Sequence, residues 1–566
     1  MVLHVCAKVS AIRLFGGLVF VIGACGFAVR NANAVPCPVA HHGPLSDADK
    51  AYRAADYKMA ENLYRAQMAA NPGNPEVTAG LVHSLLEEQK IQEAADAVQA
   101  ALAANPHSPA LITLRGEVEL REGEPWTALG SAGEAFKLDP CNPRTRLLLA
   151  RLSKLDSYYA SAQQQINFAH SLDPDDPEIQ FEWMETLPPR QQIAVLENLL
   201  SSESGDSQEL KEIRSRLDEL KKFIEGSAPP CRLVSDTSAT EIPFVDLMND
   251  ATHQAAYGMV VNFNGHDARL LIDTGAGGLT VSRSVAKRAG LKTFAKGEMG
   301  GIGDEGEKTA FAAYADSIRI GGLEFQNCTV SVLDSSSVAG SDGLIGPDVF
   351  SRFLVTLDYP AKKLLLDPLP PRPGETQAQM SLNTTGAQGV NDDSLAAMNH
   401  SPAAQNTPLV LHDRYVAPGM QDYMHVFRVG HDLLVPAQLN GQDFRLFILD
   451  TGAYDTFISP EAARRVTDVH RDDSFGVRGI SGEVRKTYMA GDLTFRFAQI
   501  SERVHKVGAF DMSDTSKEIG IEVAGFLGAT TWELMTIHID YRDGLVKFDY
   551  DPKRVPRADY RNGLVR

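Results

Sequence analysis

One ordered series of motifs occurs twice in this chain, and each copy carries the tetrapeptide Asp-Thr-Gly-Ala directly after an apolar run. The first tetrapeptide begins at Asp273 and the second at Asp450. An Asn-Gly turn between two β-rich runs precedes each of them, which is typical of a β-hairpin. The distance between the copies is nearly the same at these aspartates as at a later glycine, Gly346 or Gly528. So constant an offset indicates an internal duplication, and it restricts this part of the chain to two similar β units.

The same ordered features follow each tetrapeptide, and they define the candidate site residues. The tetrapeptide residues are Asp273, Thr274 and Gly275 in the first unit, and Asp450, Thr451 and Gly452 in the second. Glycine-rich turns follow at Gly301, Ile302 and Gly303, and at Gly479, Ile480 and Ser481. Hydrophobic-hydrophobic-Gly triplets come later, at Leu344, Ile345 and Gly346, and at Phe526, Leu527 and Gly528. One Asp-Thr-Gly arises easily by chance, whereas two with the same sequels are a strong signal.

This ordered set resembles the aspartic peptidases of the retroviral-protease type, including their bacterial relatives. The resemblance covers residues 241–370 and 407–555, each the size of one retropepsin-like unit. It implies that Asp-Thr-Gly presents a catalytic carboxylate, that the triplet supports this loop, and that the glycine-rich hairpin forms a flap over the substrate. It also implies that Thr274 and Thr451 hydrogen-bond across the pair of loops. Neither a cofactor nor a metal ion is implied.

The residue types suit the hydrolysis of peptide bonds by activated water. Two carboxyl groups held together share one proton, because both cannot ionise cheaply. The ionised group takes a proton from water, and the protonated group donates to the carbonyl oxygen of the substrate. We therefore expect an aspartic endopeptidase with Asp273 and Asp450 as its catalytic residues. The alternative is a non-catalytic protein-binding scaffold on the same fold, but a relic of an enzyme has no reason to keep both carboxylates.

The two glycine-rich turns lead to a prediction about the flaps. Each turn places one isoleucine, Ile302 or Ile480, among residues that give the backbone freedom. We expect both isoleucines to approach the cleft that holds the aspartates. The tips are predicted to be among the most mobile parts of their units.

A 34-residue period fills the region before the duplicated units. Asn-Pro or Asp-Pro pairs recur at this spacing, with a second proline three residues later each time. Their first prolines are Pro72, Pro106, Pro140 and Pro174. The period resembles the tetratricopeptide repeat, a helix–turn–helix unit. The resemblance implies a helical solenoid over residues 46–226, with capping helices at its end, and a groove that binds a substrate or a protein partner.

Residues 1–34 have the features of an export signal. A basic start and a 16-residue apolar run lead to the cleavage pattern Ala32-Asn33-Ala34. The run is too short to cross a membrane, and no other segment approaches that length. A bacterial lipid anchor at Cys25 is the less favoured alternative. We expect a periplasmic or extracellular protein, in which Cys37, Cys141, Cys231 and Cys328 form at most one disulfide, with its pairing open.

Charge and composition complete the expected organisation. The net charge of -19 disfavours nucleic acid and anionic lipid surfaces as partners. Residues 35–45 are expected to form an exposed tail, 227–240 and 371–406 linkers, and 556–566 a C-terminal tail. The second linker is long enough to let the two units pair within one chain, while pairing between chains stays open. The fold class is thus α plus β, with a helical solenoid followed by two all-β units that form a pseudo-dimer.

Overall fold

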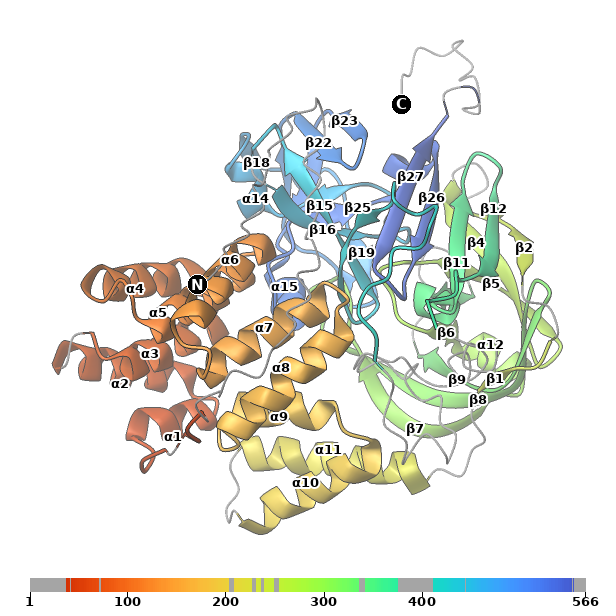
Figure 1. Ribbon diagram of the computed structural model, residues 1–566. Helices are drawn as coiled ribbons and strands as arrows, with labels where there is room; N and C mark the ends of the chain where they lie inside the picture. Colours follow the sequence, from red (N-terminus) through yellow and green to blue (C-terminus); the bar gives the residue numbers. More distant parts are fainter. Residues whose placement is uncertain are drawn as a thin grey trace, which may run out of the picture.

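The computed structural model describes residues 37–40, 42–70, 73–202, 208–225, 231–235, 239–248, 254–334, 342–374, 411–442, 444–551 and 553. Helices build the N-terminal third and strands build most of the rest, so the helical region lies beside two β units (Figure 1). This arrangement confirms the predicted fold class. The predicted signal peptide, Cys25, the centre of the second linker and the C-terminal tail fall outside the described residues. No described helix is both long and apolar enough to cross a membrane.

The repeat helices follow the 34-residue period. They are α1 Asp47–Arg53, α2 Tyr57–Ala70, α3 Pro75–Glu87, α4 Ile91–Ala104, α5 Pro109–Arg121, α6 Pro125–Leu138, α7 Pro143–Leu155, α8 Tyr159–Leu172, α9 Pro177–Glu185, α10 Pro189–Ser202 and α11 Gln208–Glu225. Helices α3, α5, α7 and α9 each begin at the proline that follows an Asn-Pro or Asp-Pro pair by three residues. Proline suits this position because the N–H that it lacks would have no partner within the first turn of a helix. The residues just before these prolines are Asn74, Ser108, Asn142 and Asp176. Each accepts a first-turn N–H through its side-chain oxygen and thereby caps the helix.

The first β unit closes into a barrel. Its elements are β1 Arg232–Leu233, β3 Val245–Met248, β4 Gln254–Phe263, β5 His266–Ile272, β6 Leu279–Ser282, α12 Arg283–Arg288, β7 Lys292–Met299, β8 Lys308–Ile320, β9 Leu323–Leu333, β10 Gly343–Ile345 and the 3-10 helix η2 Pro347–Phe350. The strand order is β1-β9-β6-β10-β5-β4-β8-β7, with β3 on β4. Because β8 pairs with both β4 and β9, the sheet curls until it meets itself.

The second unit repeats the central part of this topology in a more open sheet. Its elements are β14 Phe427–Val429, β15 Asp432–Leu439, β16 Phe444–Leu449, β17 Phe457–Ile458, α14 Pro460–Arg464, β18 Val469–Arg471, β19 Arg478–Gly479, β20 Gly482–Glu483, β21 Thr487–Ala490, β22 Leu493–Phe497, β23 Ile500–Val504, β24 Val507–Phe510, α15 Ser513–Ile519, β25 Gly525–Leu527 and α16 Ala529–Trp532. The order is β18-β21-β24-β17-β25-β16-β15-β22-β23, with β14 on β15. The strand before each Asp-Thr-Gly pairs in parallel with the triplet strand, β5 with β10 and β16 with β25. The internal duplication is therefore visible in the fold.

A six-stranded sheet joins the two units within one chain. Its strands are β2 Thr240–Pro243, β11 Phe353–Asp358, β12 Lys363–Pro368, β13 Met424–His425, β26 Met535–Asp540 and β27 Leu545–Tyr550. Each unit gives three strands in the order β13-β27-β26-β11-β12-β2, and β11 meets β26 antiparallel at the centre. Thr356 of β11 and His538 of β26 add a side-chain hydrogen bond of 2.9 Å across this junction. One apolar core runs through both units and the shared sheet, so the units pair intramolecularly.

Two turns of the repeat region dock on the second unit. In the α5–α6 turn, the carbonyl of Arg121 accepts the N–H of Glu522 (3.0 Å), and Glu124 pairs with Arg445 (2.7 Å). Trp126, at the start of α6, packs against two phenylalanines of the second unit, with ring centroids 6.3 and 6.2 Å apart. The edge of the solenoid is therefore fixed to the β region.

The α7–α8 turn makes the second set of docking contacts. Asp156 pairs with Arg414 (2.7 Å), and Ser161 donates to the carboxylate of Asp413 through both its N–H and its hydroxyl. Residues 413 and 414 precede the first strand of the second unit. They bind the repeat region before the chain enters the β sheet.

The docked turn predicts a contrast between two glycine substitutions in the repeat region. A Cβ at Gly123 would lie 2.7 Å from the carbonyl oxygen of Glu522, and the residue has φ +74°. Gly123→Ala should therefore cost about 1–3 kcal/mol of stability. Gly133, inside α6, has no atom within 4 Å of an added Cβ, so Gly133→Ala should be neutral or stabilise slightly. Thermal unfolding of both variants tests this, and equal midpoints would show that the turn contributes nothing to docking.

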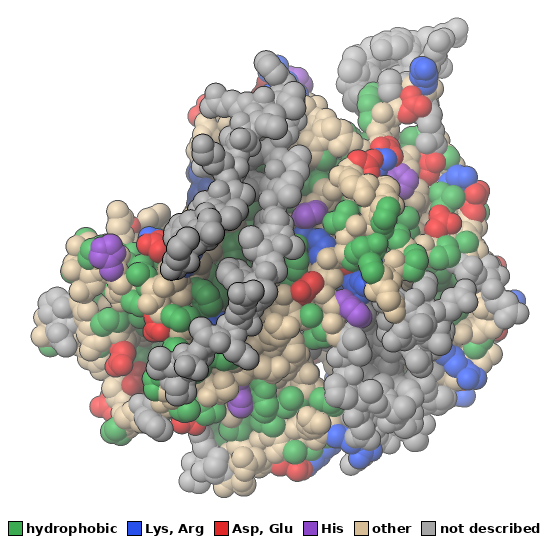
Figure 2. Space-filling model, viewed as in Figure 1, with side chains coloured by type: hydrophobic (Ala, Val, Ile, Leu, Met, Phe, Trp, Pro, Cys, Tyr) green, Lys and Arg blue, Asp and Glu red, His purple; other side chains and the backbone are tan. Residues whose placement is uncertain are grey.

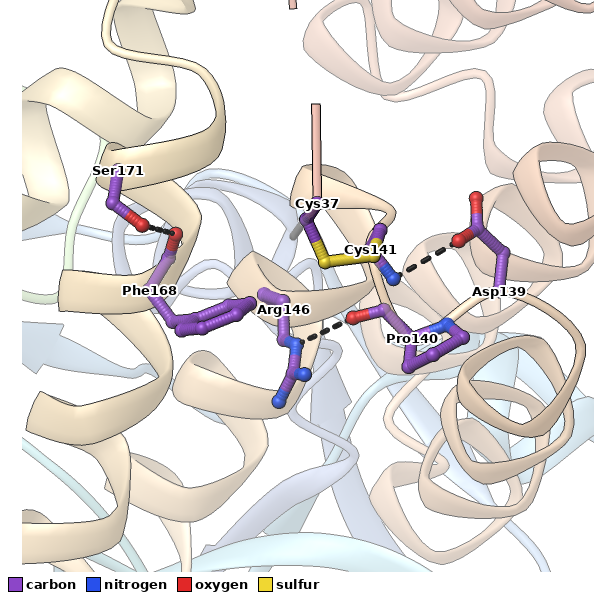
Figure 3. The surroundings of a disulfide bond; sticks show 7 residues. All are labelled: Cys37, Asp139, Pro140, Cys141, Arg146, Phe168 and Ser171. Carbon is purple, nitrogen blue, oxygen red and sulfur yellow. Dashed lines mark hydrogen bonds between the residues drawn. A yellow bond between two sulfur atoms is a disulfide. The ribbon is translucent and has the colours of Figure 1, made fainter. Parts of the chain in front are cut away.

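Two disulfides are present, so the expectation of at most one is wrong. Cys37 bonds to Cys141 and Cys231 bonds to Cys328, over sequence separations of 104 and 97 residues. Figure 3 shows the first bond beside Pro140 and Arg146, where Asp139 accepts the N–H of Cys141 (2.9 Å). Such distant cysteines leave no spacing signal, and only the fold brings them together. Bonds that close loops of this length stabilise a protein by restricting its unfolded state.

Three predicted boundaries differ from the structure. The tail 35–45 is tied to the repeats by the Cys37 bond and by His42, which lies 2.8 Å from Asp173. The linker 227–240 contains β1, which pairs with β9, because a two-residue strand has no periodic pattern to reveal it. The second residue of the linker 371–406 is Arg372, which is buried against Asp543 (2.6 Å).

Candidate active site

The hydrophobic-hydrophobic-Gly triplet of each unit holds the Asp-Thr-Gly loop of the same unit in place. The N–H of Asp273 donates to the carbonyl of Ile345, and the N–H of Asp450 donates to that of Leu527, each at 3.1 Å. Further along, Gly346 donates to the carbonyl of Gly278 (2.7 Å). Each loop is thus fixed by backbone bonds to a parallel neighbour, and each aspartate leaves its strand at the same point of the duplicated fold.

The aspartates face each other across the junction of the two units. A Cβ at Gly275 would lie 3.1 Å from Cγ of Asp450, and one at Gly452 would overlap the carboxyl group of Asp273. Glycine is therefore required at both positions. The two carboxyl groups lie close enough for the negative charge of Asp450 to raise the pKa of Asp273. Residues from the two distant copies of the motif thus form a single pair.

The two threonines lock this pair with reciprocal hydrogen bonds. The Thr274 hydroxyl donates to the carbonyl of Leu449 (2.6 Å) and accepts the N–H of Thr451 (2.9 Å). The Thr451 hydroxyl donates to the carbonyl of Ile272 (2.9 Å) and accepts the N–H of Thr274 (3.1 Å). Both side chains are buried. These are the cross-pair bonds that the resemblance implies, and they fix the distance between the loops.

Burial and mutual repulsion keep a proton on the pair. Burial raises the pKa of the Asp273 carboxyl, and the nearby negative charge of Asp450 raises this pKa further, to well above its usual range. Burial also raises the pKa of Asp450, although N–H donors from Ala453 and Gly452 counteract it. The carboxyl group of Asp273 thus keeps its proton to higher pH, and that of Asp450 ionises more readily. This is the state that acid–base hydrolysis by water requires.

Two further residues at the pair were missed by sequence reasoning. Tyr359, directly after β11, is buried at the junction of the units, and burial raises the pKa of its hydroxyl. The Asp-Tyr pair that recurs in both units was the signal for it. His431, in the turn between β14 and β15, lies with Nε2 3.4 Å from the carbonyl oxygen of Gly275. A lone histidine in a turn carries no pattern, so only the fold reveals it.

The flap tips cross over to the opposite unit. Ile480 of the second unit packs on an apolar cluster of the first unit that includes Leu271 and Leu344. Ile302 of the first unit packs on a cluster of the second unit that includes Ile448 and Phe526. These residues lie on the strands that lead into the Asp-Thr-Gly loops and on the triplets. Both isoleucines therefore approach the loops that hold the aspartates.

The tips also bind each other through hydrogen bonds. Ser481 N–H donates to the carbonyl of Ile302 (3.0 Å), and Glu305 N–H donates to that of Ser481 (2.8 Å). Asp304 accepts the N–H of Arg485 on its carboxylate (2.8 Å) and donates its own N–H to the carbonyl of Glu483 (3.1 Å). The two flaps are thus joined to each other at their tips. Their mobility stays a prediction.

The interlocked tips predict a clear difference between two glycine substitutions. A Cβ at Gly479 would overlap the carbonyl of Ile302, whereas one at Gly476 would meet no atom within 4 Å. Gly479→Ala should therefore separate the tips, and Gly476→Ala should leave them joined. Amide hydrogen exchange at Ser481 and Glu305 is the measurement, with an expected acceleration of at least about tenfold in Gly479→Ala. Unchanged protection in that variant would contradict the interlock.

The two Asp-Thr-Gly loops differ in the residues that follow. The first continues with Gly277 and Gly278, and the second with Tyr454 and Asp455, both exposed. The duplicated site is therefore not symmetric beyond its central residues. Among the described residues, no group of three or more His, Cys, Asp or Glu side chains is placed to hold a metal ion.

Comparisons with known proteins match these regions. A family model described as aspartyl protease matches residues 259–349 and 435–531, and a tetratricopeptide repeat model matches residues 51–118. The chain thus has a helical repeat region of the tetratricopeptide type and two aspartyl-protease segments, as the sequence motifs predicted.

Two solved structures are similar to about a third of this chain. A thermophilic tetratricopeptide repeat protein of Thermus thermophilus is 18% identical, with a TM-score of 0.26, over 31% of this chain and 95% of its own. The structure of MamA is 13% identical, with a TM-score of 0.19, over 32% of this chain and 95% of its own. No curated protein sequence matches the chain.

Proposed function

We propose that the chain is an aspartic endopeptidase in which Asp450 activates water and Asp273 donates a proton to the substrate carbonyl. The observation that carries this proposal is the pair of partly buried carboxyl groups, one from each duplicated loop, each of which lies against the glycine of the opposite loop. Water placed between the two groups loses a proton to Asp450 as it attacks the carbonyl carbon. The proton of Asp273 moves to the carbonyl oxygen. Asp450 then passes the proton from water to the leaving nitrogen, Asp273 recovers a proton from a hydroxyl of the tetrahedral intermediate, and the C–N bond breaks to release the amine and the carboxylic acid.

The surroundings of the pair support this assignment. The threonine bonds hold both loops in place, so little reorganisation is needed during the reaction. The flap tips lie over the loops and would exclude water once substrate is bound. A binding scaffold without activity would need neither carboxyl group, and the chain has both.

We infer that the helical repeats bind a protein, either a partner or the substrate. The first helices of successive repeats form a charged face. On it, Arg144 contacts His83 (3.0 Å) and Glu178 (3.2 Å), and Arg151 pairs with Glu178 (3.0 Å). Such a face suits a polar, charged segment. Charges of both signs are also interspersed over the side of the molecule seen in Figure 2, with no single-sign patch among the described residues in view.

Export to the periplasm or the extracellular space is part of the proposal. Two features support it: the signal-like residues 1–34 and the two disulfides, since such bonds persist in oxidising compartments. Detection of the processed chain outside the cytoplasm would test it.

The catalytic proposal predicts a bell-shaped pH dependence on the acid side. Activity needs Asp450 charged and Asp273 protonated, so it falls when both are protonated at low pH and when both are ionised at high pH. Because the pKa of Asp273 is raised, the upper limb should lie above the usual carboxyl range. The test is cleavage of an unfolded protein from pH 3 to above pH 8, with and without pepstatin and with and without a chelator. Activity that rises above pH 8 and is lost with the chelator would refute it.

A further inference from the structure

Three consecutive N–H groups of the second unit donate to the Asp-Thr-Gly loop of the same unit. The donors are Gly528, Ala529 and Thr530. In the same order, the acceptors are the hydroxyl of Thr456 (3.1 Å) and the carbonyls of Ala453 (2.8 Å) and Tyr454 (3.0 Å). We call these three bonds the loop clamp. Thr456 takes part through its side chain, so a substitution at this position removes its bond and leaves the backbone of the chain unchanged.

The hydroxyl of Thr456 is held in place by a second threonine. Thr456 and Thr531 are both buried, and their hydroxyl oxygens lie 2.7 Å apart. The Thr456 oxygen thus accepts the N–H of Gly528 and also shares a hydrogen with Thr531, which a hydroxyl allows. Because Gly528 is buried as well, the loss of this acceptor would leave its N–H without a partner.

The clamp acts on the carboxyl group of Asp450 through Ala453. Ala453 has its carbonyl in the clamp, and its N–H donates to Oδ1 of Asp450 (3.0 Å). The same oxygen accepts the N–H of Gly452 (2.8 Å). N–H donors stabilise the charged form of a carboxyl group, and these two lower the pKa of Asp450 against the effect of burial. The position of Ala453 therefore decides how readily Asp450 ionises.

The first unit lacks the hydroxyl on which the clamp depends. Leu279 stands at the place of Thr456, at the same distance after its aspartate, and leucine carries no hydroxyl. The N–H of Gly346, the counterpart of Gly528, donates to the carbonyl of Gly278 instead (2.7 Å). This contact between triplet and loop is thus made by the backbone in the first unit and by a side chain in the second.

A proline removes a further bond of the clamp from the first unit. Pro347 stands at the place of Ala529 and has no N–H to donate. Ala276 is the counterpart of Ala453. Its N–H donates to the main-chain carbonyl of Asp273 (3.3 Å), whereas that of Ala453 reaches the carboxyl group of its aspartate. The clamp therefore belongs to one unit, and it makes the surroundings of the two aspartates unequal.

We propose that Thr456 is a positioning residue that, through Ala453, keeps Asp450 the ionised member of the pair. This inference rests on the proposed peptidase function and deepens it. Without the hydroxyl, the N–H of Gly528 loses its acceptor, the loop shifts, and the N–H of Ala453 withdraws from the carboxyl group. Asp450 then holds a proton to higher pH, and a smaller fraction of the chain can activate water.

Other ionisable groups also lie near the two carboxyl groups. They are Asp273 on the first loop, Tyr359 directly after β11, Asp455 in the second loop and His431 beside the first loop. A substitution of Thr456 removes none of these groups. A change in the titration of Asp450 in such a variant therefore reports the position of the loop itself.

The test is Thr456→Val, which removes the hydroxyl and keeps the shape of the side chain. Cleavage of an unfolded protein is followed from pH 3 to above pH 8. At the optimum we expect kcat to fall about tenfold with KM within about twofold, since the clamp holds the carboxyl group and not the substrate. The acid limb of the pH profile should move up by about one pH unit, and the upper limb, set by Asp273, should stay. Thr456→Ser, which restores the hydroxyl, should recover most of the activity.

Thr113→Val is the matched control. Thr113 and Thr145 form another buried hydroxyl pair, 2.6 Å apart, between α5 and α7 of the repeats. The control should lose a similar amount of thermal stability and keep kcat and both limbs. If Thr456→Val fails to fold, Thr531→Val serves in its place, because it frees the hydroxyl that accepts from Gly528. The acid limb should then move in the same direction by a smaller amount.

A titration that needs no turnover separates this inference from the peptidase proposal. The carboxyl carbon of Asp450 is followed by NMR in chains whose aspartates carry a carbon isotope label, and it is identified by its absence in Asp450→Asn. The midpoint of its titration should move up by about one pH unit in Thr456→Val. If the wild-type chain cleaves nothing but the midpoint moves, the peptidase proposal fails and the role of Thr456 stands. An unmoved midpoint, an equal loss of kcat in Thr113→Val, a shift of the upper limb alone or no recovery in Thr456→Ser would overturn the inference.

Discussion

Replacing Asp273 with asparagine is expected to lower kcat/KM for peptide cleavage by about a thousandfold or more, and Asp450→Asn should do the same. Each aspartate supplies a different half of the acid–base pair, and residues that act as a unit cannot substitute for each other. Each carboxyl group lies against the glycine of the opposite loop, so the loss of either one breaks the same pair. Steady-state kinetics on an unfolded protein substrate at the pH optimum is the measurement.

The loss of activity should come without a loss of stability. In the unfolded chain Asp273 gives up its proton near pH 4, whereas the raised pKa in the folded chain keeps the proton to higher pH. This group therefore favours folding at low pH, and its contribution is lost as the pH rises toward the folded pKa. Asp273→Asn removes that dependence, so its melting temperature at pH 7 should equal or exceed that of the wild-type chain. Near wild-type activity in either variant would rule out a shared site.

A second large effect is expected at Asp543, which is fully buried beside the shared sheet. Its carboxylate accepts hydrogen bonds from Arg372 (2.6 Å), Arg542 (2.8 Å) and the N–H of Tyr415 (2.9 Å). Asp543→Ala removes this counter-ion from the buried Arg372 and leaves Arg542 with the more distant carboxylate of Asp540 (3.8 Å), which costs about 3–5 kcal/mol of unfolding free energy. Urea unfolding of the full chain measures this loss.

A matched substitution at an exposed pair provides the control for Asp543. Asp492 lies in the same unit and pairs with Arg503 (3.2 Å), but both side chains are about half exposed or more. Asp492→Ala should therefore change stability by less than about 1 kcal/mol. Asp543→Asn, which keeps the volume and one acceptor, should lose less than Asp543→Ala. If Asp543→Ala and Asp492→Ala lose the same amount of unfolding free energy, the buried cluster does not stabilise the junction.

The sequence was sufficient for the features that repeat. The 34-residue period predicted the repeat helices because proline and the residue before it act locally, at the start of each helix. The duplicated motifs predicted the paired aspartates, the triplets and the flap tips, because each motif recurs with the same neighbours. A chance match to a motif in one copy would not recur at the same place in the other copy, so the repetition itself supports each prediction.

Features that occur once were not predictable from one sequence. The Cys231–Cys328 bond, the position of His431 and the buried contacts of Asp543 join residues far apart in the chain, with no spacing rule between them. The docking of the repeats on the second unit depends on two turns, and turns carry weak sequence patterns. In each case the tertiary fold, rather than any local preference, decides the contact.

The shared sheet also sets when a newly made chain can first form the pair of aspartates on which the proposed hydrolysis depends. Its central pair joins β11 and β26, whose partners Thr356 and His538 are far apart in the chain, so β11 must wait for β26 to emerge. Until then Asp273 has no opposing carboxyl group, and contacts of such long range form slowly. A partly synthesised chain therefore lacks the paired carboxyl groups of the proposed active site. The paired site can therefore form only after both units have been synthesised and the junction between them is complete.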